Sequence, residues 1–180
     1  MVNPPMPSRV TLRPLTEDDA PQLAVFARRV FEETFAPDND PTDLATYLDR
    51  AFGEAIQRAE LAEPNVEALV AELDGGWAGY TLVRHGVPHP LASGISPLYL
   101  QRFYVDHRWH GHGIAAMLME AVVAIATRQQ HDVIWLTTWE RNTRALRFYA
   151  KQGFADIGGE TFLLGTDLQD DRVLAKRLVP

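Results

Sequence analysis

The stretch Leu98–Arg128, LYLQRFYVDHRWHGHGIAAMLMEAVVAIATR, decides how the rest of the chain is interpreted. Its first part is rich in aromatic and aliphatic residues, which predicts a β-strand over Leu98–Val105. From Gly113 to Arg128 apolar residues recur every three or four positions, and this spacing predicts an amphipathic helix packed on a sheet. Between them lies RWHGHG, residues 108–113, whose glycines leave room for a ligand against the backbone. Because a helix start presents free N–H groups and the positive end of its dipole, we interpret this loop as an anion site.

The glycine loop alone does not identify the ligand. Ala116 stands where a dinucleotide-binding G-x-G-x-x-G motif needs its third glycine, and the chain has no Gly-Lys-Ser/Thr of a Walker A motif. A second distinctive block, NTRALRFYAKQGF over Asn142–Phe154, follows a continuous apolar run at Val133–Trp139 that predicts a buried strand. The two separated blocks together are much more specific than either one.

The order of the other elements predicts an α/β domain with a mixed sheet. Prolines and glycines separate the elements, and the spacing of apolar residues assigns each one to a helix or a strand. The order is β-α-α-β-β-β-α-β-α-β-β, with an irregular loop at 86–97 and a flexible, Pro-rich start at 1–8 before a single domain at 9–180. Strands are expected at Arg9–Arg13, Val66–Leu73, Trp77–Arg84, Leu98–Val105, Val133–Trp139, Phe154–Leu164 and Arg172–Val179, and helices after Thr16 up to Phe35, from Asp43 to about Ala62, and over Gly113–Arg128 and Asn142–Gln152.

Composition narrows the classes of function. The chain has 180 residues, the usual size of one domain, and no cysteine. The lack of cysteine excludes thiol nucleophiles and cysteine-ligated metals, and it fits a reducing compartment. No apolar run approaches a membrane span, so we expect a cytoplasmic protein with no membrane partner. The net charge of −7, from 17 Lys and Arg against 24 Asp and Glu, argues against nucleic acid and favours cationic partners.

The two blocks resemble motifs of the GNAT superfamily of acetyl-CoA-dependent N-acyltransferases. The loop matches the R/Q-x-x-G-x-G/A pattern and the second block matches N-x-x-A-x-x-x-Y-x-x-x-G-F, through Arg108, Gly111, Gly113, Asn142, Ala145, Tyr149, Gly153 and Phe154. The resemblance implies the GNAT fold, a mixed and mostly antiparallel sheet with helices on both faces. Further stretches resemble the PaiA-type branch, which acetylates spermidine and spermine: Phe35, Asp43-Leu44, 102–105, Trp135-Leu136, Trp139-Glu140 and 161–165.

The resemblance implies acetyl-CoA as cosubstrate, bound where the strands ending at Val105 and Trp139 separate. Pantetheine would pair with the backbone of Phe103 and Val105, and the pyrophosphate would lie on the N–H groups of 108–113. Tyr149 would protonate the leaving thiolate while the Val105 N–H polarises the carbonyl, in direct transfer within a ternary complex. The expected cofactor-binding residues are Phe103, Tyr104, Val105, Arg108, Trp109, His110, Gly111, His112, Gly113, Ile114, Ala115, Asn142, Ala145 and Tyr149.

The general base is less clear from the sequence. The family often places a glutamate in the strand before the loop, and Tyr99 stands at that position here. Glu140 and a water chain are therefore the alternatives, and the expected catalytic residues are Tyr149 and Glu140. We expect no metal, because His107, His110 and His112 have no carboxylate at ligand spacing beside them.

The acceptor is predicted to be a small primary amine, with a polyamine first among the candidates. Between Glu32 and Glu67 ten acidic residues stand against two basic ones, which either attracts a polycation or is a solvated helix face. The alternatives are a protein N-terminus, a lysine, an amino acid, a drug amine, or a catalytically silent acyl-CoA-binding module. We expect a monomer or a homodimer.

Overall fold

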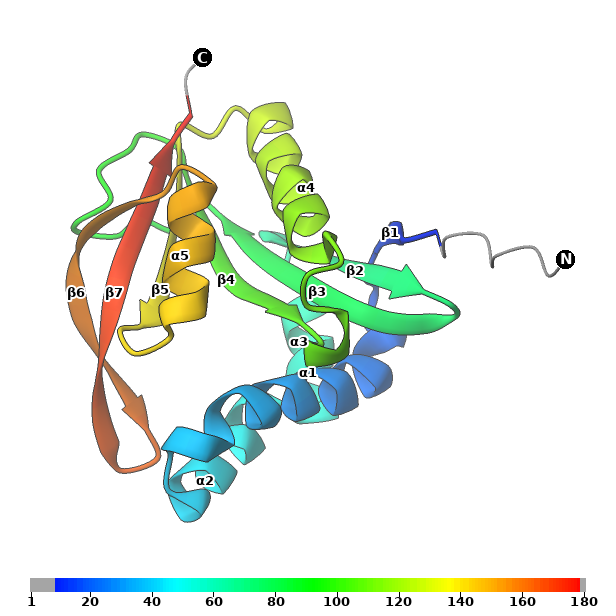
Figure 1. Ribbon diagram of the computed structural model, residues 1–180. Helices are drawn as coiled ribbons and strands as arrows, with labels where there is room; N and C mark the ends of the chain where they lie inside the picture. The colour runs from blue at the N-terminus through cyan, green and yellow to red at the C-terminus, as the bar shows by residue number, and fades with distance from the viewer. Residues whose placement is uncertain (1–8, 179–180) are drawn as a thin grey trace, which may run out of the picture.

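The computed structural model describes residues 9–178, which form one seven-stranded sheet with helices on both faces (Figure 1). The strands are β1 (Thr11–Pro14), β2 (Val66–Leu73), β3 (Gly76–His85), β4 (Pro97–Val105), β5 (Val133–Trp139), β6 (Ala155–Leu164) and β7 (Asp167–Arg177). The helices are α1 (Ala20–Phe35), α2 (Pro41–Ala51), α3 (Glu54–Leu61), α4 (Ile114–Arg128) and α5 (Thr143–Lys151), with short 3-10 turns η1 (Glu17–Asp19), η2 (Ala36–Asp38) and η3 (His107–Trp109). The predicted flexible segment 1–8 and the predicted strand end at Val179 lie outside the described residues.

The sheet has the order β1-β2-β3-β4-β5-β7-β6. Only β4 and β5 run parallel, and every other neighbouring pair is antiparallel. Helices α1 to α3 cover one face and helices α4 and α5 cover the other (Figure 1). The predicted α/β class with a mixed, mostly antiparallel sheet is therefore confirmed.

Two predicted elements differ from the structure. The single helix expected from Asp43 to Ala62 is wrong, because Phe52 and Gly53 leave helical geometry and separate α2 from α3. Phe52 turns into the core, 5.3 Å from the Phe31 ring, and the Gln57 amide donates to the Ala51 carbonyl at the end of α2. The last strand begins at Asp167 rather than Arg172, because β6 and β7 form a hairpin that closes at Gly165, where φ is +63°.

A β-bulge in β4 determines which side chains reach which face. Leu100 pairs with Val83 and Arg102 pairs with Leu82, so Gln101 is an extra residue in the strand. Leu100 packs on the face covered by α4 and α5, whereas Arg102 bonds Gln57 and Glu60 of α3 on the opposite face. Because one inserted residue reverses the alternation, Phe103 returns to the α4 and α5 face.

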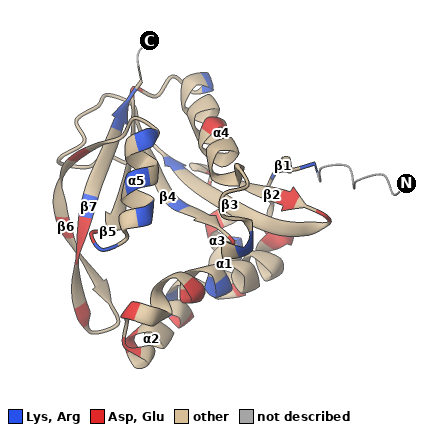
Figure 2. Ribbon diagram, viewed as in Figure 1, with Lys and Arg blue, Asp and Glu red and all other residues tan. Residues whose placement is uncertain are grey.

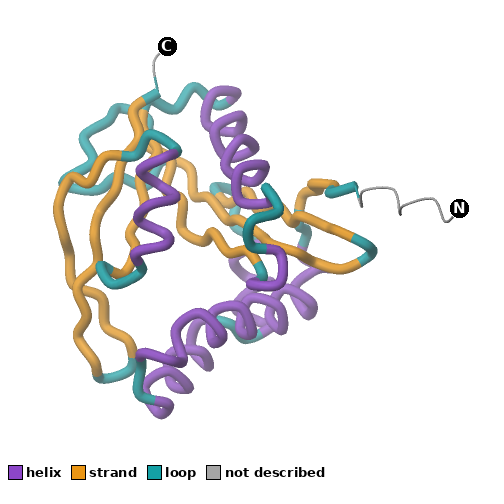
Figure 3. Tube along the Cα trace, viewed as in Figure 1, coloured by secondary structure: helices purple, strands orange, loops and turns teal. Residues whose placement is uncertain are grey.

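The parallel strands β4 and β5 separate after a short paired region. Their register is Pro97 with Val133, Leu98 with Ile134 and Tyr99 with Trp135, and no pair follows among the described residues. Past this point strands of the sheet separate in the Cα trace (Figure 3). Beyond Tyr99, the edge of β4 that faces β5 has no partner strand among the described residues. The fold thus leaves unpaired backbone at the centre of the sheet.

Two stacked histidines join the end of β3 to the loop after α4. The His85 Nδ1 lies 2.7 Å from the His131 Nε2, and the other nitrogen of His131 lies 3.1 Å from the Ser96 hydroxyl. Burial, assisted by the nearby His131, lowers the pKa of His85. The unfolded chain therefore binds a proton at this site at a higher pH than the folded protein does.

We expect the free energy of unfolding to fall as the pH falls through the ordinary histidine range, about 6.5. The His85→Gln variant should show a shallower fall, because it removes one of the protons that drive unfolding. Urea denaturation across about pH 5 to 8 measures this difference. His112→Gln, at an exposed position, is the control and should keep the wild-type slope. Equal slopes for His85→Gln and wild type would contradict the role of His85.

Candidate active site

A cavity of about 450 Å³ occupies the space between the separating strands. Its walls come from β4, β5, α5 and the first turn of α4. It gathers twelve of the residues expected to bind the cofactor: Phe103, Tyr104, Val105, Trp109, His110, Gly111, Gly113, Ile114, Ala115, Asn142, Ala145 and Tyr149. Three expected site residues, Arg108, His112 and Glu140, do not line it.

The glycine loop has the backbone geometry of an anion site. Gly111 and Gly113 have φ values of +83° and +81°, and apart from their chain neighbours no described atom lies within 4 Å of the place a Cβ would occupy at either residue. Gly113 precedes α4, so the amides of the first helical turn, including Ile114 and Ala115, have no carbonyl one turn earlier to bond. An anion in the cavity meets these amides and the positive end of the helix dipole.

Asp106 holds this loop in shape. Its side chain is fully buried, accepts from the Arg108 amide at 3.0 Å, and pairs with the guanidinium groups of Arg29 and Arg108 at 2.6 Å each. Burial alone would raise the pKa of Asp106, but the hydrogen bonds from Arg108 and Arg29 outweigh it and hold that pKa well below its usual range. The side chain of Arg108 is therefore engaged with Asp106 instead of pointing into the cavity.

His112 and Glu140 also lie apart from the cavity. His112 is exposed and its Nδ1 lies 3.1 Å from the His110 carbonyl oxygen. Glu140 is exposed in the turn after β5, where its amide donates to the Asp170 carbonyl. Glu140 does not line this cavity, so its position gives no support to a role as general base.

We expect Gly111→Val to weaken acetyl-CoA binding by at least about tenfold, or about 1.4 kcal/mol. A β-branched residue is strained at positive φ and must move the loop away from its anion-binding geometry. The matched control is Gly111→Asn, because asparagine tolerates this backbone region, and it should keep most of the affinity. Calorimetry measures both. Unchanged affinity in a folded Val variant would place the pyrophosphate elsewhere.

Tyr149 faces the cavity from α5. It is only 7% exposed, and its ring lies 6.1 Å from the Phe103 ring across the cavity wall. Burial raises the pKa of Tyr149 well above the ordinary phenol value, so the hydroxyl stays protonated. A buried, protonated hydroxyl beside the cavity is suited to donate a proton.

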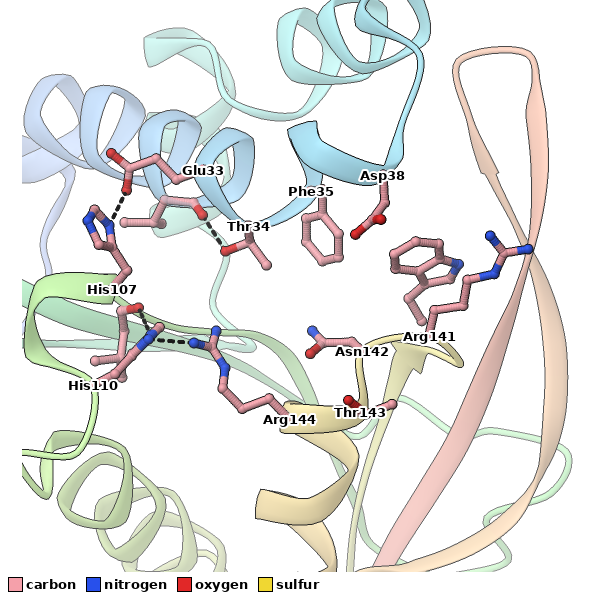
Figure 4. A pocket seen from close by; sticks show the side chains of 13 residues that line it. Glu33, Thr34, Phe35, Asp38, His107, His110, Arg141, Asn142, Thr143 and Arg144 are labelled. Carbon is pink, nitrogen blue, oxygen red and sulfur yellow. Dashed lines mark hydrogen bonds and ion pairs between the residues drawn. The ribbon is translucent and has the colours of Figure 1, made fainter.

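The cavity opens into a side pocket of about 370 Å³ between the end of α1 and the start of α5 (Figure 4). Asn142 caps α5 by accepting from the Ala145 amide at 3.2 Å, which leaves its side-chain nitrogen facing the pocket (Figure 4). His110 contacts the Val105 carbonyl oxygen at 3.0 Å through Nε2, and the Arg144 guanidinium approaches its Nδ1. Glu33 of α1 and Asp38 of η2 line the same pocket (Figure 4). They face two arginines of the segment from β5 to α5, Arg141 and Arg144, across it.

A third cavity, of about 270 Å³, lies on the face covered by α1 to α3. We call it the acceptor-side cavity. It meets the first cavity where β4 and β5 separate, because both are lined by Phe35, Gln101, Tyr104, Thr137 and Thr138. Its other lining residues are Phe31, Tyr47, Phe52, Tyr99, Arg102, Trp139, Phe162, Leu164, Gln169 and Asp171.

Sequence reasoning did not find Asp171, the one carboxylate among these lining residues. Asp171 lies in β7 beside Trp139 of β5 and Glu160 of β6, and its side chain is buried. The only available signal was an acidic pair, Asp170-Asp171, before an apolar strand. Nothing in that local pattern distinguishes a buried acid from an exposed one.

Two features of residues 9–178 bear on other functions. Glu33, Asp106 and His107 bring three ligand-type atoms within 4.8 Å of one another, but both acids already pair with arginines. No helix in this part of the chain is long and apolar enough to cross a membrane.

Comparison with known proteins agrees with this arrangement. Residues 27–154 match the model of the Acetyltransferase (GNAT) family. An uncharacterized N-acetyltransferase of Mycobacterium tuberculosis is 35% identical over 161 residues, which are 89% of this chain and 99% of that protein. A spermine/spermidine N(1)-acetyltransferase of Bacillus subtilis is 29% identical over 82 residues, 45% of this chain and 50% of that protein. A PaiA N-acetyltransferase from Thermoplasma acidophilum, solved with coenzyme A, superposes with a TM-score of 0.76 at 17% identity, covering 94% and 99% of the two chains.

Proposed function

The chain belongs to the GNAT acetyltransferase family and is an acetyl-CoA-dependent N-acetyltransferase, and from this premise we propose that its acceptor is a cationic primary amine, with a polyamine as the first candidate. The observation that carries the proposal is the acceptor-side cavity. Aromatic rings form most of its wall, and a single carboxylate, Asp171, lies among them.

The chemistry of that wall suits an alkylammonium group. The Phe35 and Trp139 rings lie 6.2 Å apart, and the Tyr47 and Phe162 rings lie 5.4 Å apart. Aromatic faces attract cations and also accept the methylene groups between the charges of an alkylamine. A buried carboxylate adds a counter-charge, which a neutral or anionic acceptor would not need.

Two further observations bear on a polyamine acceptor, and the second supports it less than the sequence suggested. The Bacillus subtilis relative bears the name of a spermine/spermidine acetyltransferase, although the similarity spans half of that protein. Figure 2 shows acidic residues along the helices α1 and α2 of the segment from Glu32 to Glu67. Most of the acids of this segment have partners within the protein. Asp40 caps α2, Asp43 bonds Thr166 and Glu60 pairs with Arg102. The long-range attraction proposed for this segment therefore reduces mainly to Asp38, which lines the side pocket.

Direct transfer accounts for the roles of the residues. In the proposed complex the acetyl-CoA pyrophosphate lies on the amides of the glycine loop and the pantetheine runs along β4 between Phe103 and Val105. The amine enters from the acceptor-side cavity and attacks the thioester carbonyl, which the Val105 N–H polarises. The C–S bond then breaks, and Tyr149 protonates the sulfur. A cytoplasmic location and the absence of a metal stay predictions.

An amine panel assayed with acetyl-CoA and thiol detection tests the acceptor. We expect the highest kcat/KM for spermidine or spermine and a fall in that value as salt rises, because exposed charges are screened over about 8 Å at physiological ionic strength. Monoamines should respond less to salt. Preference for a protein N-terminus, lysine, an amino acid or a drug amine would replace the polyamine and leave the acetyltransferase intact.

Charge reversal at Asp38 gives a more local test. Asp38→Lys should raise the KM for spermidine without changing the affinity for acetyl-CoA, since a like charge would then face the distal ammonium groups. Glu32→Lys is the matched control: Glu32 is an exposed acid on α1 that lines none of the three cavities. An equal rise in KM for both variants would mean that only the overall charge of this surface matters.

A further inference from the structure

Asp171 is a buried acid that takes no part in the proton transfers of the reaction scheme above. Its residue is 7% exposed, and within residues 9–178 its carboxylate forms no ion pair. The nearby Arg102 already forms an ion pair with Glu60, whose carboxylate lies 2.8 Å from the Arg102 guanidinium. A buried carboxylate without a cation is costly unless a ligand supplies one.

The position of Asp171 links the two cavities. Thr137, whose hydroxyl favours the charged form of the Asp171 carboxylate, lines both the acceptor-side cavity and the first cavity. Asp171 lies opposite Trp139 in the β5–β7 register, and Thr137 lies two residues before Trp139, so all three side chains share one face of the sheet. An amine that reaches the thioester from this side passes Asp171.

The electrostatics of the site favour proton exchange near neutral pH. Burial, followed by the negative charge of Glu160, raises the pKa of Asp171 to about 6, while the Thr137 hydroxyl opposes the rise. The carboxylate is therefore largely ionised at neutral pH, yet holds a proton more firmly than an ordinary aspartate. Such a value suits a general base for an ammonium group that must lose a proton before attack.

We propose that Asp171 is the general base of the transfer, the group that deprotonates the acceptor ammonium in the acceptor-side cavity. Asp171 takes one of the three ammonium protons, and the freed lone pair forms the N–C bond at the thioester carbonyl. The C–S bond breaks and its electron pair stays on sulfur. Tyr149 then donates its hydroxyl proton to the sulfur and takes a proton from the nitrogen in exchange. One hydrogen stays on the amide, and Asp171 releases its proton to solvent. This inference rests on the proposed primary-amine acceptor.

The test is the Asp171→Asn variant, assayed with whichever amine of the panel gives the highest kcat/KM. We expect kcat to fall by about 10²-fold or more, the range of a lost general base, with unchanged affinity for acetyl-CoA. The acidic limb of the wild-type kcat profile, near pH 6, should disappear. Asn is close to Asp in shape and removes a charge that burial disfavours, so the variant should stay folded, as thermal melting will check.

Two controls separate the base from a structural role. Asp170→Asn changes the exposed neighbouring acid, which lines none of the three cavities, and should leave kcat at its plateau unchanged. Because the negative charge of Asp170 also helps to raise the pKa of Asp171, the acidic limb of this variant should move to lower pH but should not disappear. Glu160→Gln removes the charge that helps to raise the pKa of Asp171 and should move the acidic limb to lower pH while keeping activity.

Retained kcat with an unaltered acidic limb in Asp171→Asn would overturn the inference and leave the acetyltransferase and its amine standing. If no primary amine is acetylated by the wild-type enzyme, the proposed acceptor fails and the role of Asp171 fails with it. If Asp171→Asn loses the acidic limb of the kcat profile and also melts at a lower temperature, Asp171→Glu decides between the two roles. That variant restores a carboxylate and should recover activity if Asp171 is the general base. No recovery in a folded Glu variant would count against it.

Discussion

Replacing Tyr149 with phenylalanine is expected to lower kcat by about 10²-fold to 10⁴-fold, the range for a lost general acid. The change removes one hydroxyl and leaves the ring, which packs against Phe103, Phe148 and Phe154. Since burial holds that hydroxyl in its protonated form, its loss forces the thiolate to leave without a proton. The ground-state contacts with acetyl-CoA are unaffected, so the dissociation constant should stay the same.

Steady-state kinetics with the preferred amine and calorimetry with acetyl-CoA measure the two quantities separately. The matched control is Tyr80→Phe, because Tyr80 is a fully buried tyrosine in the core whose hydroxyl has no hydrogen-bond partner among the described residues. That variant should keep its kcat and lose no stability. Wild-type kcat in Tyr149→Phe would return Tyr149 to a packing role, and a large loss of melting temperature would make packing the explanation.

Most of the residues predicted to bind the cofactor line one cavity, because the prediction rested on local backbone requirements. Gly111 and Gly113 are needed where φ is positive at a helix start, and Asn142 and Tyr149 lie seven residues apart on one helix segment. Spacing within one element survives folding unchanged. The same reasoning did not reveal that the Arg108 guanidinium pairs with Asp106, two residues earlier, or that Arg29 of α1 pairs with the same carboxylate.

The acceptor side was not predictable for the opposite reason. Asp171 comes from β7, Thr137 from β5 and Tyr47 from α2, and only the pairing of strands far apart in sequence brings them together. The bulge at Gln101 adds a second obstacle, since it reverses which β4 side chains face the acceptor. Simple alternation from Leu98 would place Tyr104 on the same face as Leu100, whereas it lies on the other one.

The largest stability effect is expected on the floor of the acceptor-side cavity, where Arg102 is buried. Its guanidinium lies 2.8 Å from Glu60, donates to Gln57 at 2.7 Å and lies 5.0 Å from the centre of the Phe52 ring. The Glu60 side chain is only 12% exposed, so solvent screens the pair little. Through these contacts, Arg102 of β4 holds α3 and the turn that precedes it against the sheet.

Glu60→Gln should lower the free energy of unfolding by about 3–5 kcal/mol, because it keeps the shape of the side chain and leaves the Arg102 charge buried without its anion. Urea denaturation measures the loss. The control on the same helix is Glu54→Gln, whose pair with Arg58 is exposed and should contribute less than about 1 kcal/mol. The double variant Glu60→Leu with Arg102→Met should recover most of the stability, because no unpaired charge then stays buried. If Glu60→Gln costs no more than Glu54→Gln, water reaches Arg102 through the acceptor-side cavity, and the cavity floor is a solvated surface instead of a fixed wall.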